Sequence, residues 1–193
     1  MNTNRNPHLT KTQIETHICQ YLNVSKVIWL PLGLTADEDT NGHIDNFCCF
    51  VKPGKVLLAW TEDPTDEQYE ISRTALAILE AETDASGRSL EVVKIPIPKK
   101  MYYTQDILDT YGEASSTSRI VGQRLAGSYV NFLIVNGGVV FPTFDCEEDA
   151  TATQILQECF PDRTVVGVPG KEILLGGGNI HCITQQHPLF ATK

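Results

Sequence analysis

Residues 47–60 read FCCFVKPGKVLLAW, two β-rich runs on either side of the turn Lys52-Pro53-Gly54-Lys55. Turn residues of this kind between strand-forming runs predict a β-hairpin. A helical pattern begins at about Thr65, and the apolar run Val92–Ile95 then ends in Pro96. The expected fold is therefore built on a unit with the order strand, strand, helix, strand.

The same order recurs later in the chain. A second hairpin is predicted from Tyr129 to Phe144 around the turn Asn136-Gly137-Gly138, and a helix is expected to start near Asp145–Glu148. The strand-like run Val165–Pro169 completes this second unit. Repeated units bury their apolar faces against neighbouring units. The predicted class is thus α/β, made of repeated strand–strand–helix–strand units.

The first part of the chain reads as a remnant of another unit. A helix capped by Thr10 or Thr12 precedes the strand-like run Val27–Pro31, without a hairpin before it. A chain that opens partway through a unit is expected to be truncated. Between the two complete units, Tyr102–Arg124 with its cluster Ser115–Ser118 is expected to be an insertion or a long loop.

Length and composition indicate an ordinary globular protein. The 193 residues, 41% apolar and 20% charged, favour one domain spanning residues 1–193. A formal charge of −9 disfavours nucleic acid as a partner, and no run approaches the ~20 apolar residues of a membrane helix. Six cysteines without a CxxC pair, in a chain without a signal sequence, predict reduced thiols in the cytoplasm and no metal centre.

Two dense polar stretches could carry chemistry. Residues 176–186, GGGNIHCITQQ, place Cys182 after a glycine turn that follows the run Glu172–Leu175, which is expected to be a strand. Residues 37–46, DEDTNGHIDN, supply His43 and Asp45. If the units surround a common axis, these three side chains converge there. His181 is expected to face away from Cys182, because neighbouring side chains alternate in an extended segment.

The residue types favour a cysteine nucleophile that acts on a cation. A thiolate needs a neighbouring base or a lowered pKa, and His43 is the best imidazole for that role. Carboxylates raise the pKa of a nearby thiol, so they suit a substrate that is itself positive. A guanidinium pairs bidentately with carboxylates and would stabilise the thiolate. The pattern therefore predicts a cysteine hydrolase or transferase with a cationic substrate.

Each feature also has a structural interpretation. Cys182 could be a small buried residue, the segment around His43 a turn into a strand, the run Asp37–Asp39 a solvated loop, and Asn131 a partner for backbone groups. A papain-like protease is disfavoured, because the signatures of that family around its nucleophile are absent. The three polar sites together, at equivalent strand ends, favour an active site.

Three segments resemble the agmatine deiminase (agmatine iminohydrolase) family, in the peptidyl-arginine-deiminase-like branch of the guanidino-modifying (pentein) superfamily. They are residues 29–46, 128–132 and 176–186. The resemblance implies a five-fold α/β propeller with the active site on its axis. It also implies that Cys182 attacks the guanidinium carbon of agmatine and that His43 helps ammonia to leave. Water then releases N-carbamoylputrescine, a step of putrescine and polyamine biosynthesis, and no cofactor is needed.

The resemblance further assigns residues to the substrate. Asp45 would hold the guanidinium nitrogens, and further substrate contacts would come from Asp37, Asp39, Asn131 and Gly177. Family members also use acidic residues from an earlier part of the chain that has no counterpart here. The chain is therefore expected to be an incomplete propeller with weak or no activity. The alternative is a fragment that binds a complementary chain or associates with itself through open edges.

Overall fold

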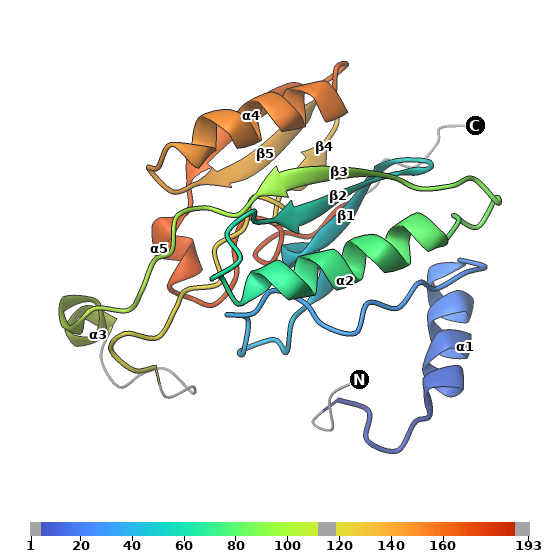
Figure 1. The fold of residues 1–193 in the computed structure, drawn as a ribbon, viewed down its shortest axis with the longest axis horizontal. Helices are drawn as coiled ribbons and strands as arrows, with labels where there is room; N and C mark the ends of the chain where they lie inside the picture. The colour runs from blue at the N-terminus through green and yellow to red at the C-terminus, as the bar shows by residue number, and fades with distance from the viewer. Residues whose placement is uncertain (1–4, 112–118, 188–193) are drawn as a thin grey trace.

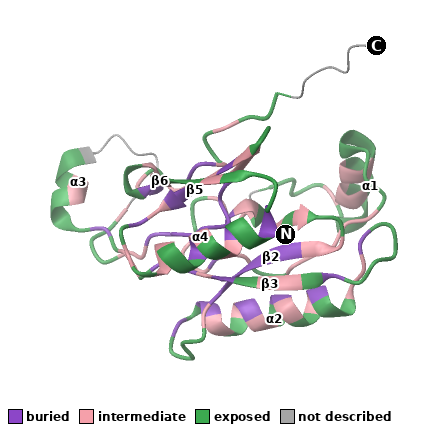
Figure 2. Cartoon of the chain, turned by 90° about the horizontal axis from the view of Figure 1, so that it is seen from above, coloured by how far each residue is buried: buried purple, intermediate pink, exposed green. Residues whose placement is uncertain are grey.

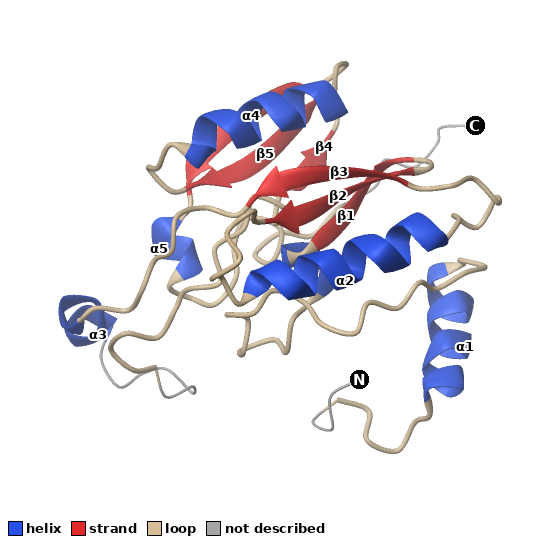
Figure 3. Cartoon of the chain, in the orientation of Figure 1, coloured by secondary structure: helices blue, strands red, loops and turns tan. Residues whose placement is uncertain are grey.

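Two small β-sheets, each covered by a helix, form the centre of the structure (Figures 1 and 3). The structure is a computed structural model that describes residues 5–111 and 119–187. Each sheet has three strands, and the two sheets follow one another in the chain. The fold is therefore mixed α/β, as the sequence predicts.

The first sheet is the predicted first unit. Strands β1 (Cys48–Lys52) and β2 (Lys55–Trp60) form an antiparallel hairpin. Helix α2 (Gln68–Ala81) then leads to β3 (Glu91–Pro96), which pairs with β2 in parallel. The predicted hairpin, helix and strand are confirmed.

The second sheet repeats this order. Strands β4 (Leu133–Val135) and β5 (Gly138–Thr143) are antiparallel, and β6 (Thr164–Pro169) is parallel to β5. Helix α4 (Glu148–Cys159) connects β5 to β6. The second unit is also confirmed, although β4 begins at Leu133 rather than at the predicted Tyr129.

Helices α2 and α4 each bury one face against the sheets (Figure 2). The buried positions of α2 recur at helical spacing, from Gln68 and Ser72 to Ala75 and Leu79. They lie over β2, the most buried strand of the first sheet. Helix α4 contacts both β6 and β3, and its Leu156 has no exposed area. Packing of α4 thus joins the two units into one core.

The first helix is confirmed, but the strand expected after it is not. Helix α1 (Lys11–Leu22) begins with a capping box in which Thr10 and Gln13 bond each other's backbone N–H groups. The following run Val27–Pro31 forms no strand and pairs with none of the strands of the described ranges. Side-chain contacts hold it instead. Trp29 Nε1 donates to the Glu15 carboxylate across 2.5 Å.

Two further segments differ from expectation. The connection Tyr102–Arg124 lies between the two units, where an insertion or a long loop is expected, but it contains helix α3 (Gln105–Tyr111) and its two ends meet in a β-bridge. Its cluster Ser115–Ser118 lies outside the described residues. The run Glu172–Leu175, expected as a strand, falls mainly in helix α5 (Lys171–Leu174). Four residues are too short for a period to distinguish the two structures. None of the helices in the described ranges is long and apolar enough to span a membrane.

The packing of α4 makes a stability prediction. Replacing the fully buried Leu156 with alanine is expected to lower the free energy of unfolding by about 2–5 kcal/mol, because the cavity forms where both units meet. The matched control is Leu22→Ala on α1, where the leucine is 69% exposed and the expected change is within about 0.5 kcal/mol. Urea unfolding measures both, and equal effects would contradict this account of the core.

Candidate active site

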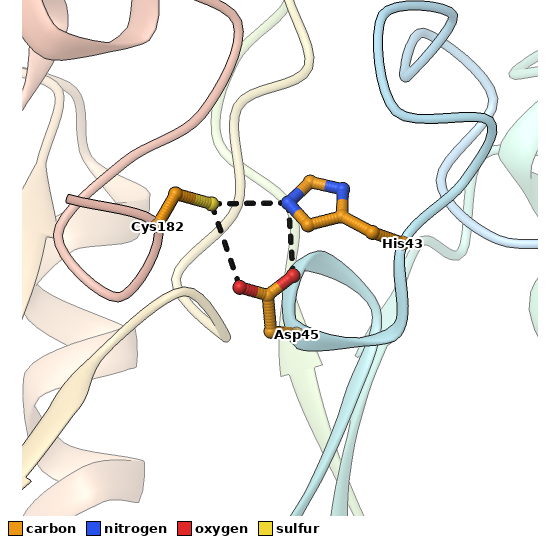
Figure 4. Close-up of side chains that lie close together, drawn as sticks. All are labelled: His43, Asp45 and Cys182. Atoms are coloured by element: carbon orange, nitrogen blue, oxygen red, sulfur yellow. Dashed lines mark hydrogen bonds and ion pairs between the residues drawn. The ribbon is translucent and has the colours of Figure 1, made fainter. Parts of the chain in front are cut away.

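His43, Asp45 and Cys182 come together although up to 139 positions separate them in the chain (Figure 4). The Nε2 atom of His43 lies 3.0 Å from the Cys182 sulfur and 2.8 Å from Asp45 Oδ1. The sulfur lies 3.4 Å from Asp45 Oδ2. The structure thus places a thiol, an imidazole and a carboxylate in mutual contact.

Local backbone geometry presents the histidine and the aspartate. His43 is the N-cap of the short 3₁₀ turn Ile44–Asn46, which carries Asp45. Just before it, Gly42 has φ +73°, a conformation that favours glycine, and its backbone lies against Gly33. A Cβ atom on Gly33 would lie only 2.3 Å from the Gly42 carbonyl oxygen. The loop therefore closes on itself immediately before His43.

Asp37 lies behind the imidazole rather than in the cleft. Its carboxylate accepts the backbone N–H of His43 at 2.9 Å and also contacts His43 Nδ1 and the Thr40 hydroxyl. Asp37 was expected to contact the substrate. Its side chain has no exposed area, however, and it holds His43 in position instead.

These contacts set the charge of the site. Burial alone would lower the pKa of His43, but hydrogen bonds to Asp37, Asp45 and Cys182 raise it to about 11. Burial alone would raise the pKa of Asp45, but hydrogen bonds to His43 and His181 and the charge on His43 lower it to about 2. At neutral pH an imidazolium therefore lies between two carboxylates, with its Nε2 proton available next to the sulfur.

Asn131 holds the turn that carries the cysteine. Its amide Nδ2 donates to the Cys182 sulfur at 3.0 Å, and its Oδ1 accepts the backbone N–H groups of His181 and Cys182 at 2.9 and 3.3 Å. Asn131 has no exposed area. Its polar atoms are thus occupied by the Cys182 turn and not by the cleft, which differs from the expected substrate contact.

His181 belongs to the site, although the sequence predicts that it faces away from Cys182. Its Nδ1 lies 2.6 Å from Asp45 Oδ2. The expectation was wrong because residues 180–183 form a turn and not an extended segment. Successive side chains in a helix-like turn differ by about 100° rather than 180°, so both can face one site. The preceding glycine run, Gly176–Gly178, was the available signal for a turn.

A cleft of about 490 Å³ opens in front of these residues. Asp39 and Gly177 lie on its wall together with His43, Asp45 and Cys182. The Asp39 side chain is 30% exposed, and Gly177 has φ +97°. A Cβ atom on Gly177 would lie 2.4 Å from Asp39 Oδ2, so only glycine leaves room for this carboxylate. The cleft thus presents two carboxylates and a thiol to whatever enters it.

The same three side chains are the one group of the described residues that could hold a metal ion, since their ligand atoms lie within 4.8 Å of one another. A metal would need a neutral imidazole, and the raised pKa of His43 opposes that. The arrangement fits covalent catalysis better. A cysteine nucleophile, an adjacent proton donor and carboxylates that attract a cation are all present.

Comparison with known proteins gives a consistent result. A family model described as Porphyromonas-type peptidyl-arginine deiminase matches residues 1–188. Agmatine deiminases of Pseudomonas syringae and Pseudomonas aeruginosa are 56% and 57% identical to the chain over 189 residues. A solved agmatine deiminase structure from Enterococcus faecalis superposes with a TM-score of 0.90 at 42% identity. All three alignments cover 97% of this chain and 51% of the relative, so the chain spans about half their length.

The contact with Asp37 predicts the titration of His43. Replacing Asp37 with asparagine removes the carboxylate at Nδ1, so the pKa of His43 should fall from about 11. NMR titration of ¹³C-labelled imidazole measures it. Asp63→Asn is the matched control, because the Asp63 carboxylate accepts from the backbone N–H and the hydroxyl of Thr65 in an exposed loop. An unchanged His43 titration in Asp37→Asn would contradict the assignment.

The same shift predicts a pH dependence of stability. The pKa of His43 is about 11 in the folded chain against an ordinary value of 6.5. Stability from this group is therefore fully present below about pH 6.5 and is lost as the pH rises through about 11. In Asp37→Asn the loss should begin at the same pH, which the unfolded chain sets, but it should be complete at a lower pH and smaller in total. Urea unfolding between pH 6 and 11 checks the direction, and a parallel curve for both proteins would refute it.

Proposed function

The chain belongs to the Porphyromonas-type peptidyl-arginine deiminase family, and we propose that its cluster of His43, Asp45 and Cys182 is the active site of an agmatine deiminase. The observation that carries the proposal is the convergence of these three side chains on one cleft. The high identity to agmatine deiminases of Pseudomonas species supports agmatine as the substrate.

In the proposed reaction, the Cys182 sulfur attacks the guanidinium carbon of agmatine as a thiolate. One C–N bond breaks, and the leaving nitrogen takes the Nε2 proton of His43 and departs as ammonia. The product of this step is an amidino-thioether on Cys182. His43, now neutral, takes a proton from water as the water attacks the same carbon. The C–S bond then breaks and the proton of the added hydroxyl passes to solvent, which leaves the free thiolate and N-carbamoylputrescine.

The geometry supports a division of roles among the surrounding residues. Asp45 faces the sulfur and is placed to accept N–H groups of the guanidinium, and its pKa of about 2 keeps it charged. Asp39 and Gly177 line the cleft wall, where the rest of the substrate would lie. Asp37 fixes the imidazole, Asn131 fixes the cysteine turn, and both act through those residues.

We also propose that the two complete units belong to a five-fold α/β propeller, of which this chain forms the C-terminal part. Support comes from the repeated strand order and from the likeness to the E. faecalis enzyme over 51% of its chain. A cytoplasmic location and a role in putrescine biosynthesis remain predictions.

A second candidate function is association with a complementary chain or a second copy. It is favoured by strands β1 and β4, which are edge strands of their sheets, and by exposed apolar side chains on β1 and at the end of α1. Phe50 on β1 is 51% exposed, and Leu22 and Tyr21 at the end of α1 are 69% and 80% exposed. If this surface mediates association, light scattering after size exclusion should give a discrete oligomer that Phe50→Lys converts to monomer. A monomer at all concentrations would exclude self-association.

Activity is tested by product formation from agmatine. We expect the chain to release ammonia and N-carbamoylputrescine slowly, because it spans about half the length of its relatives. The absence of a single preorganised charged group that stabilises the transition state lowers the rate by a factor of about 10² or more. Cys182→Ala should abolish the product. Cys19→Ala, which changes a thiol on α1, should leave the rate unchanged. Mass spectrometry detects the ureido product, and a wild-type signal no higher than that of Cys182→Ala would refute the proposed function.

A further inference from the structure

Arg119 joins three segments of the chain that are distant in sequence. One terminal nitrogen of its guanidinium donates to the carbonyl oxygen of Leu175, and the other lies 3.4 Å from Asp39 Oδ2. The hydroxyl of Tyr103 donates to the same Leu175 carbonyl at 3.0 Å, and its ring lies 5.4 Å from the guanidinium carbon. Arg119 therefore contacts both the loop that carries Asp39 and the end of α5.

The two contacts connect Asp39, which lines the cleft, to the segment that leads into the glycine run of the cleft wall. Leu175 directly precedes the glycine run that leads to Cys182. Within that run, Gly177 approaches Asp39 so closely that a Cβ atom would overlap its carboxylate. The Asp39 side chain is thus confined between the guanidinium of Arg119 and the backbone of Gly177. Its direction in the cleft depends on both.

The burial of Arg119 suggests that its position has a purpose beyond stability. Its side chain is only 17% exposed, and its Nε is buried without a hydrogen-bond partner among the described residues. Leaving a buried donor unpaired costs free energy, and a single 3.4 Å ion pair compensates weakly. The planar guanidinium of Arg119 instead holds its two acceptors, the Leu175 carbonyl and the Asp39 carboxylate, in a fixed relative position. A lysine ammonium cannot reproduce this geometry.

We propose that Arg119 is a positioning residue that sets the selectivity of the cleft for a substrate with a cationic tail. It does so by holding the Asp39 carboxylate against the turn that leads to Cys182. The inference rests on the proposed function, in which a guanidinium lies at Cys182 and the remainder of the substrate extends along the cleft wall. Arg119 touches no reacting atom and acts through Asp39.

Hydrogen exchange tests the positioning without any ligand. In Arg119→Met, amide exchange should accelerate in both residues 37–43 and residues 175–182, while β2 and β5 keep their protection. Arg163→Met is the matched control, because Arg163 donates to the Val135 carbonyl in the second hairpin and faces no part of the cleft. Unchanged exchange in either loop, or equal acceleration in the core strands, would overturn the positioning role.

Ligand protection of Cys182 tests the selectivity. Iodoacetamide alkylates the thiol, and bound agmatine should slow this reaction, as should n-butylguanidine, which has the same guanidinium but no ammonium. In Arg119→Met, the agmatine concentration needed for protection should rise about tenfold, as expected for loss of one contact to a charged group. The value for n-butylguanidine should change less than twofold. Arg119→Lys should not restore agmatine binding.

A double-mutant cycle shows whether Arg119 acts through Asp39. Asp39→Asn should weaken agmatine selectively, and Arg119→Met with Asp39→Asn should be no weaker than either single variant. Additive losses, or an equal loss for both ligands, would overturn the role of Arg119 and leave the proposed function standing. A wild-type chain that neither ligand protects would overturn the proposed function and the selectivity together, and the exchange result would still decide whether Arg119 holds the two loops.

Discussion

The contact between the buried carboxylate of Asp37 and the ring of His43 is the constraint on which the site depends. It fixes the imidazole from behind, so that Nε2 can only face Asp45 and Cys182. It also keeps the ring charged, because a carboxylate lies at each of its nitrogens. The close backbone approach of Gly33 and Gly42 closes the loop that holds this pair. The position of His43 therefore depends on a close backbone approach that the glycines at positions 33 and 42 permit.

The fold brings these parts together through its repeated units. The loop with His43 and Asp45 leads into the first hairpin, and Asn131 lies just before β4 of the second. Cys182 follows β6 and α5 in the chain, and its sulfur and its backbone N–H are hydrogen-bonded to the side chain of Asn131. Helix α4 packs on both β3 and β6 and so connects the two units. Equivalent ends of successive units therefore meet, although the residues involved are far apart in the chain.

Much of the fold and part of the candidate site could be predicted from the sequence, and the predictions that were wrong have physical causes. Turn chemistry and apolar period located both hairpins and the helices α1, α2 and α4, because those signals are local. The strand prediction at Val27–Pro31 was wrong, because a strand needs a pairing partner and the local sequence pattern does not reveal one. Asp37 and Asn131 were identified as site residues, but the direction of a side chain depends on tertiary contacts. The contact of His181 with the site was not predicted, because its segment was expected to be extended. Arg119 was not predicted either, because the sequence before it has no pattern that indicates a structure.

The chemical environment of the other cysteines bears on oxidative damage. Burial raises the pKa of Cys48 to about 12 and that of Cys49 to about 11, and it also raises the pKa of Cys146 and Cys159. Thiols held in the protonated form react poorly with peroxides and electrophiles. Cys182, by contrast, is exposed and lies beside an imidazolium. Peroxide would thus be expected to oxidise Cys182 in the cleft before the thiols whose pKa is raised by burial.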